Sequence, residues 1–213
     1  MRLEPPVDRP LRVVALGAHP DDVEIGAAGL VIRLVAETPA LEVRWLIATA
    51  TPLRRAEATR SARVLLGDRV PVEIDIAEHR DGYLPFLGAA PKEWLARHQG
   101  FDPDLVISPW RHDRHQDHRL LGELAWQVFR DALVLEYEVP KYEGDLGQPN
   151  LFVTLDRATA ERKVSTILEV FTSQADRRWF DAETFWALLR LRGVEAASPT
   201  GYAEAFHGTK IRI

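Results

Sequence analysis

Short apolar runs that alternate with longer amphipathic segments are the feature that most constrains the fold of this chain. Residues 11–16 form a run typical of a buried strand, and the stretch to about Glu37 carries apolar residues at helical spacing. The pattern repeats, with an expected strand over 43–49, a helix over 52–66 and a strand over 70–76. Such alternation predicts a parallel sheet covered by helices.

Shorter elements continue this alternation in the second half of the chain. The expected elements are a helix over 91–99, a strand over 104–108, a helix to about Ala132, strands over 134–139 and 151–155, helices over 156–171 and 182–190, and an extended segment over 202–213. Loops are expected at 81–85 and 142–150. No repeat, linker or low-complexity tract divides the 213 residues. The predicted architecture is therefore one α/β domain over 1–213, with a Rossmann-like, mostly parallel sheet flanked by helices.

Two polar clusters, at residues 19–24 and 112–118, each follow an expected strand. They hold four of the seven His of the chain and five carboxylates: His19, Asp21, Asp22, Glu24, His112, Asp113, His115, Asp117 and His118. Ligands of open α/β sheets bind outside the carboxyl ends of the strands. We therefore expect the two clusters to form one site, although about 90 residues separate them.

The side chains in these clusters are of the kinds that bind a catalytic metal ion. The chain has no Cys, so any metal site must use His, Asp and Glu. A catalytic zinc site commonly has three protein ligands and leaves a fourth position for water. His19 and Asp22 are three positions apart around a turn fixed by Pro20, so both can approach one ion. His115 and His118 have the same spacing on an expected helical turn, and the spacing leaves open which of them binds.

The segment Ala18-His19-Pro20-Asp21-Asp22-Val23-Glu24, together with Asp113-Arg114-His115-Gln116-Asp117-His118, resembles the LmbE-like, or PIG-L-type, zinc deacetylases. Members of this family remove acetyl groups from N-acetylglucosamine conjugates. Weaker matches are Arg54 with Glu57, the pair Ser173-Gln174, and the segment 201–206. The resemblance implies a hydrolase that acts on an amide bond.

The resemblance also implies a role for each residue of the two motifs. His19, Asp22 and His118 would hold Zn²⁺ or another divalent metal. Asp21 would act as the general base, and His115 as a catalytic acid or oxyanion stabiliser. Asp117 would orient His115, so the expected catalytic residues are Asp21, His115 and Asp117. Zinc suits amide hydrolysis because it lowers the pKa of a bound water toward ~7. Either His115 or Asp21 could protonate the departing amine.

Outside the motifs the sequence predicts fewer functional residues. Arg54 is a candidate to bind an anionic part of the substrate, although an Arg and a Glu three positions apart on a helix more often form a solvated ion pair. Trp110 and the pair Trp179-Phe180 are expected to pack in the core, with stacking on a sugar as the alternative for Trp110. The remaining His are expected at the surface: His79, His98, His112 and His207.

Other functions find less support in the sequence. No Gly-x-Ser-x-Gly, phosphate-binding loop or Gly-x-Gly-x-x-Gly motif is present, which disfavours a serine hydrolase and a nucleotide-binding protein. A metallo-β-lactamase-like hydrolase needs His where Asp113 stands. A non-catalytic metal- or sugar-binding protein of the same fold is expected to lose Asp21 or His115, and the chain has both.

Charge and hydropathy restrict the partners. The net charge of −5 argues against a nucleic acid partner. No run approaches the ~20 apolar residues of a membrane span, and residues 1–6 lack the apolar stretch of a secretory signal, so a soluble cytoplasmic protein is expected. The expected partner is a small N-acetylated sugar or glycoconjugate, and the resemblance is compatible with a homo-oligomer.

Overall fold

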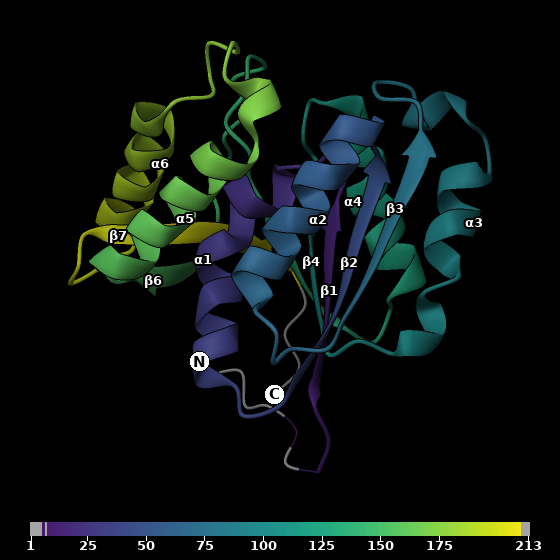
Figure 1. The fold of residues 1–213 in the computed structure, drawn as a ribbon, viewed down its shortest axis with the longest axis horizontal. Helices are drawn as coiled ribbons and strands as arrows, with labels where there is room; N and C mark the ends of the chain where they lie inside the picture. Colours follow the sequence, from purple (N-terminus) through teal and green to yellow (C-terminus); the bar gives the residue numbers. More distant parts are fainter. Residues whose placement is uncertain (1–5, 7, 210–213) are drawn as a thin grey trace.

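One seven-stranded sheet organises the computed structural model, which describes residues 6 and 8–209 (Figure 1). Its strands are β1 (Leu11–Gly17), β2 (Leu41–Thr49), β3 (Val72–His79), β4 (Leu105–Pro109), β5 (Leu133–Tyr137), β6 (Leu151–Leu155) and β7 (Tyr202–Gly208). The strand order is β3-β2-β1-β4-β5-β7-β6. Strands β1 to β5 pair in parallel, and β7 pairs antiparallel with β5 and β6. The predicted mostly parallel α/β class is confirmed, and the metallo-β-lactamase alternative, which requires a β-sandwich, is wrong.

Helices cover both faces of this sheet. They are α1 (Asp22–Glu37), α2 (Pro52–Leu66), α3 (Ala90–Ala96), α4 (Gln116–Val128), α5 (Arg157–Val170) and α6 (Ala182–Glu195), with short 3₁₀ turns at Leu84–Phe86, Gln99–Phe101 and Thr172–Gln174. Side chains of β1 alternate between the two faces, so Val13 and Ala15 join the core under α1, α2, α5 and α6, whereas Val14 and Leu16 join the core under α3 and α4.

The expected elements are present, and the differences lie at their ends. Helix α2 and strand β6 have the predicted bounds. Asp156 caps α5, since its carboxylate accepts a 2.7 Å bond from the Thr159 amide. Helix α4 ends at Val128, before the predicted Ala132, and α6 extends to Glu195. Tertiary packing decides such ends. Residues 210–213 of the last predicted segment lie outside the described residues.

Helix α1 packs unusually close to the sheet because small residues face it. A Cβ added to Gly26 would lie 2.2 Å from Cδ2 of Tyr137, and one added to Gly29 would lie 2.5 Å from Cδ1 of Leu155. Only glycine fits at this distance. The small residues 26–29 therefore let α1 pack closely against the sheet.

A buried ion pair also holds α1. Nζ of Lys163, on α5, lies 2.6 Å from Oε1 of Glu204 and donates a 2.6 Å bond to the Ile25 carbonyl. The Glu204 carboxylate accepts 2.7 Å bonds from the backbone amides of Gly29 and Leu30. Strand β7 and helix α5 therefore grip the middle of α1 through its backbone.

Candidate active site

The two polar clusters meet where the direction of strand connection reverses. Cluster 19–24 follows β1 and cluster 112–118 follows β4, and these strands are neighbours in the sheet. This is the switch point at which open α/β sheets bind ligands. The same end of the sheet is marked by the arrowheads of β2 and β3 at the top of Figure 1. Nδ1 of His19 lies 3.2 Å from Nε2 of His118, so the expected convergence of the clusters is confirmed.

Donor atoms of three residues lie at similar separations in this site. Besides the 3.2 Å between the two imidazoles, Asp22 places Oδ1 3.2 Å from Nε2 of His118 and Oδ2 3.5 Å from Nδ1 of His19. Ligands of a tetrahedral Zn²⁺ with bonds of about 2.0–2.1 Å are separated by about 3.3–3.4 Å. The neutral nitrogen and carboxylate donors and their spacing therefore fit a divalent ion. His19, His115 and His118 also form a group whose ligand atoms lie within 4.8 Å of one another.

Electrostatics bind these side chains to one another. Burial raises the pKa of Asp22, but His118 and His19 outweigh it and hold that pKa well below its usual range. Burial lowers the pKa of His118, but Asp22 and Asp113 outweigh it and raise that pKa to about 9. The ionised carboxylate of Asp22 therefore favours a positive charge next to it. A metal ion or a protonated imidazole supplies that charge.

Carboxylates contact the outer nitrogens of both imidazoles. Nδ1 of His118 lies 3.0 Å from Oδ2 of Asp113, and Nε2 of His19 lies 3.0 Å from Oδ1 of Asp81 and 3.3 Å from Oδ2 of Asp117. Such contacts orient metal-binding imidazoles in proteins. The sequence analysis included Asp113 in the second polar cluster but gave it no role. Nothing in the sequence pattern pointed to Asp81, which approaches His19 from the 81–85 loop.

The carboxylate of Asp117 contacts the 81–85 loop and His19, and its predicted role of orienting His115 stays a prediction. Its two oxygens accept bonds from the backbone amides of Gly82, at 2.7 Å, and Leu84, at 3.0 Å, besides approaching His19. His115 instead contacts the Asp117 backbone, whose amide donates to its Nδ1 at 3.3 Å. Through these contacts Asp117 holds the 81–85 loop next to His19.

His115 caps α4 and faces both of the other imidazoles. Its ring centroid lies 4.9 Å from that of His19 and 4.8 Å from that of His118. Because Nδ1 accepts the Asp117 amide, the proton of a neutral His115 is on Nε2. Burial and the two neighbouring imidazoles lower the pKa of His115. The neutral ring therefore presents an Nε2–H donor.

Asp21 is held in a strained conformation beside this cluster. Its φ of 99° is in the region that favours glycine, and such strain is concentrated at functional sites. Nη2 of Arg54 lies 2.9 Å from its Oδ2. Burial raises the pKa of Asp21 to about 7, although Arg54 opposes the rise.

Arg54 is not a solvated surface residue. Its side chain is 14% exposed, and it contacts Asp21, Glu57 and the Pro20 carbonyl. Glu57 in turn accepts bonds from the amide and hydroxyl of Ser173, at 2.9 and 2.7 Å. Of the weaker sequence matches, Arg54, Glu57 and Ser173 thus belong to one network behind Asp21, whereas segment 201–206 lies largely in β7.

A cavity of about 830 Å³ opens above these residues. Besides the cluster itself, its lining includes His79, Arg80, Asp81, Val139, Lys141, Tyr142, Glu143, Gln174, Arg177 and Trp179. Trp179, predicted to pack in the core, is half-buried in this wall. Trp110 stacks on His207 at 4.2 Å, away from the cavity lining. His98, predicted at the surface, is buried, because its ring contacts Asp75 of β3 at 2.9 Å and Arg44 of β2 at 3.4 Å.

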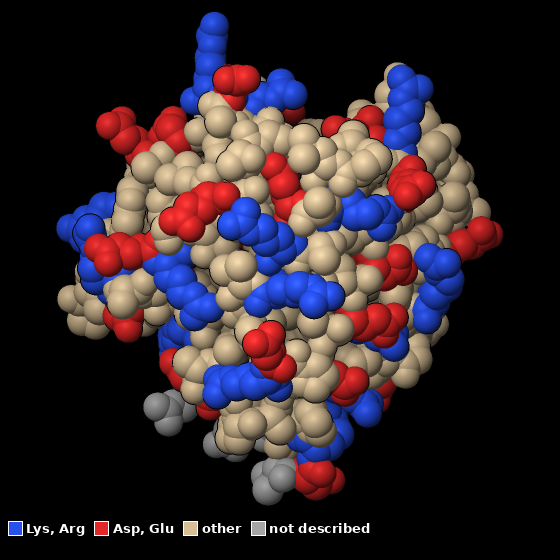
Figure 2. All heavy atoms as spheres, viewed as in Figure 1, with Lys and Arg blue, Asp and Glu red and all other residues tan. Residues whose placement is uncertain are grey.

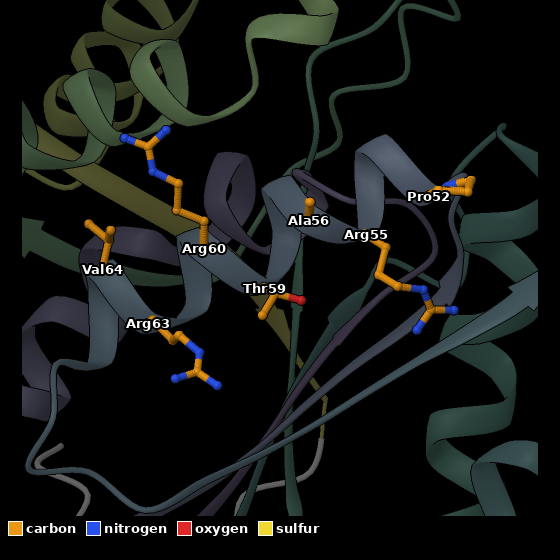
Figure 3. A pocket seen from close by; sticks show the side chains of 7 residues that line it. All are labelled: Pro52, Arg55, Ala56, Thr59, Arg60, Arg63 and Val64. Carbon is orange, nitrogen blue, oxygen red and sulfur yellow. The ribbon is translucent and has the colours of Figure 1, made fainter.

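A second hollow lies on the outer face of α2 and differs in kind (Figure 3). A single helix lines it, with Arg55 and Arg63 pointing to one side of the helix and Arg60 to the other, and its lining holds no carboxylate or imidazole. On this face of the molecule, basic and acidic side chains are interspersed (Figure 2). The hollow therefore offers no cluster that could carry chemistry.

The fold and the site together define a hydrolytic enzyme of the class that cleaves amides. Over residues 14–129, more than half of its length, the sequence matches the family described as PIG-L: GlcNAc-PI de-N-acetylase. The chain belongs to this PIG-L, or LmbE-like, family. Among the described residues, no helix has the length and apolar character to cross a membrane.

Solved structures share the fold at low sequence identity. An N,N'-diacetylchitobiose deacetylase from Pyrococcus horikoshii has a TM-score of 0.74 and 21% identity, covering 93% of this chain and 84% of that one. GalB, a 4-carboxy-2-hydroxymuconate hydratase from Pseudomonas putida KT2440, has a TM-score of 0.74 and 16% identity, with 95% and 97% covered. The zinc-inhibited form of the teicoplanin deacetylase Orf2 has a TM-score of 0.67 and 15% identity, with 92% and 97% covered.

Proposed function

We propose that the chain is a zinc-dependent N-deacetylase that hydrolyses the acetamido group of an amino sugar, such as N-acetylglucosamine or one of its conjugates. The observation that carries this proposal is the spacing of 3.2–3.5 Å among donor atoms of His19, Asp22 and His118, next to the strained Asp21. Family membership and the deacetylases of similar fold support the reaction type.

His19, Asp22 and His118 are the proposed metal ligands. A divalent ion such as Zn²⁺ in this position supplies a Lewis acid and lowers the pKa of a bound water to about 7. Asp113 and Asp117 contact the outer nitrogens of the two imidazoles, and so keep the inner nitrogens directed toward the centre of the site.

Asp21 is the proposed general base. Its carboxylate is buried beside the three ligands, where it can accept the proton of the attacking water. Arg54 holds that carboxylate at 2.9 Å and thereby limits the orientations that it can adopt. A direct contact of Arg54 with the substrate, as the sequence suggested, stays a prediction.

His115 is the proposed donor to the substrate. Its Nε2–H can bond the carbonyl oxygen as negative charge develops there, a contribution typically worth about 10²–10³ in rate. The proton taken up by Asp21 can then pass to the departing amine, or His115 can supply a proton from its imidazolium form and return to the neutral ring. Both groups line the cavity, so either one can reach a substrate bound there.

Substitution of Asp21 by Asn tests this function, because it removes the base and keeps the ligands. Asn tolerates a positive φ, so the backbone is retained. We expect D21N to bind zinc as the parent does and to release acetate from N-acetylated sugars at least about 10²-fold more slowly. D102N is the matched control, since Asp102 is exposed, has a φ of 51° and is absent from the cavity lining.

His118→Ala tests the metal site separately. The substitution removes a proposed ligand, so zinc content should fall well below one ion per chain. Normal acetate release by D21N, or undiminished zinc in H118A, would contradict the corresponding role. A parent enzyme that binds zinc but releases no acetate from any N-acetylated sugar or amide would favour another reaction, such as the hydration catalysed by the hydratase of similar fold, or a non-catalytic binding protein.

A further inference from the structure

Lys141 connects cluster 112–118 to the wall of the cavity. Its Nζ lies 2.8 Å from Oδ2 of Asp113 and 2.7 Å from Oδ1 of Asp145. We propose that Lys141 is a positioning residue for substrate binding, which holds residues 142–146, the wall segment, in place beside the proposed metal ligands. This inference rests on the proposed function and adds a residue that neither sequence motif contains.

The Asp113 end of this connection is fixed independently of Lys141. Oδ1 of Asp113 accepts a 2.7 Å bond from the His115 amide, and its Oδ2 lies 3.0 Å from Nδ1 of His118. Both partners belong to the same cluster and to the start of α4. The carboxylate of Asp113 therefore keeps two partners, and its contact with the proposed ligand His118, when the lysine is removed.

The Asp145 end lies on a segment without helix or strand, between β5 and β6. Besides contacting Lys141, Asp145 accepts a 2.7 Å bond from the Arg114 amide through Oδ2, and Nη1 of Arg114 donates a 3.1 Å bond to the Glu143 carbonyl. The next part of the chain is held from α6, through a bond to the Gly147 carbonyl. The wall segment is thus anchored to the cluster chiefly through Asp145.

Charge makes Lys141 the decisive anchor. The side chains of Asp113, Lys141 and Asp145 are 3%, 11% and 6% exposed, so two buried carboxylates share one ammonium group. Removal of that group leaves buried charges without compensation, which is strongly unfavourable. Asp145 is the carboxylate that can reach water, because its neighbours Gly144 and Leu146 are exposed. Loss of Lys141 therefore releases the wall segment and leaves Asp113 in place.

The wall segment presents Tyr142 to the cavity. Tyr142 lines the cavity and is 71% exposed, so its ring and hydroxyl are available to a ligand. A ligand that contacts this ring binds only when the segment is in place, and its apparent affinity falls with the fraction of molecules in that state. Lys141 therefore acts on the affinity for the substrate through Tyr142.

Limited proteolysis of the zinc-loaded enzyme tests the anchoring. A protease that cleaves after glutamate attacks Glu143 in the released segment, and its rate follows the population of that state. We expect K141M to be cleaved there about tenfold faster or more than the parent, and K141R, which keeps the charge, to resemble the parent. Cleavage of K141M at the parent's rate would overturn the proposal.

Two further variants complete this measurement. D145N breaks the same ion pair with an isosteric side chain and should also be cleaved faster, which keeps the test available if K141M folds poorly. K92M is the matched control, because Lys92 is exposed on α3 and absent from the cavity lining, and its cleavage after Glu143 should match that of the parent.

Binding and kinetics relate the anchor to the substrate. N-acetylglucosamine is titrated into zinc-loaded D21N and D21N/K141M, and its hydrolysis by the parent and K141M is compared. We expect about tenfold weaker binding and a correspondingly higher KM, with kcat within about threefold and zinc content unchanged. K141R should recover most of the affinity. Loss of zinc, or a lower kcat at unchanged KM, would place the action of Lys141 on His118 and overturn the proposal.

A double-mutant cycle assigns the effect to Tyr142. Y142A should weaken binding of the sugar to D21N, and weaken it much less in D21N/K141M, where the ring is already displaced. Additive effects of the two substitutions would overturn this role of Lys141.

Proteolysis needs neither turnover nor a sugar, so it separates this inference from the proposed function. Faster cleavage of K141M in an enzyme that releases no acetate supports the anchor and contradicts only the proposed function. Equal cleavage of K141M and an active parent contradicts only the anchor.

Discussion

Nη2 of Arg54 lies 2.9 Å from Oδ2 of Asp21, and this contact joins the second helix to the turn that follows the first strand. The same guanidinium contacts Glu57 and the Pro20 carbonyl. Arg54 therefore acts, in the first place, on the position of the proposed base.

We expect R54M to reduce kcat by about 10–100-fold with KM changed by less than about threefold, because a small displacement of a catalytic group is costly. R54K, which keeps the positive charge, should be less impaired. Steady-state kinetics on an N-acetylated sugar, with zinc content and thermal unfolding as checks, measures this. A raised KM with normal kcat would instead assign Arg54 to substrate binding.

Gly26 should be intolerant of any side chain. A Cβ there would lie 2.2 Å from the Tyr137 ring, whose hydroxyl is itself fixed by a 2.8 Å bond to the Leu16 carbonyl. We expect G26A to lower the free energy of unfolding by about 1–3 kcal/mol or more, the usual cost of overpacking. Urea denaturation measures it. G100A is the control, since no atom lies within 4 Å of its added Cβ, and it should change stability by less than about 0.5 kcal/mol.

The buried pair of Lys163 and Glu204 should be costly to break from one side. K163M leaves the Glu204 carboxylate buried with only backbone amides as partners. We expect a loss of about 3–5 kcal/mol in the free energy of unfolding. The double variant K163M/E204Q removes the uncompensated charge and should recover part of that loss in a double-mutant cycle. Equal stability of K163M and the parent would show that the pair contributes little.

His207 should make stability depend on pH. Burial, with Arg192, His112 and Arg111 nearby, lowers the pKa of His207 to about 4, below the value of about 6.5 in an unfolded chain. As the pH falls from about 6.5 to about 4, the unfolded state takes up the proton first, so the free energy of unfolding decreases over this window.

H207F should show a weaker decrease, because it removes the titrating group and keeps an aromatic ring against Trp110. Nε2 of His207 has no hydrogen-bond partner, so the substitution breaks no such bond there. Urea denaturation at pH 7 and pH 4.5 compares the two proteins. Parallel decreases in the parent and H207F would show that other groups cause the pH dependence.

The alternation of strands and helices and the location of both His and Asp motifs could be predicted from the sequence. These properties are local, because an apolar run of strand length, or a helical spacing of apolar residues, is decided by neighbours along the chain. The meeting of the two clusters, one after β1 and one after β4, was then expected from a general rule on where α/β sheets bind ligands. For this reason His19 and His118 could be expected to meet before any coordinates were known.

The partners of the motif residues were decided by the tertiary structure. Asp117 turned out to hold the 81–85 loop next to His19, Arg54 to contact Asp21, and His98 to be buried against Asp75 and Arg44. Each of these contacts joins elements whose relative placement depends on loop paths and helix packing. Sequence spacing carries no information on such distances, because residues far apart along the chain become neighbours only when the sheet assembles and the loops close over its edge.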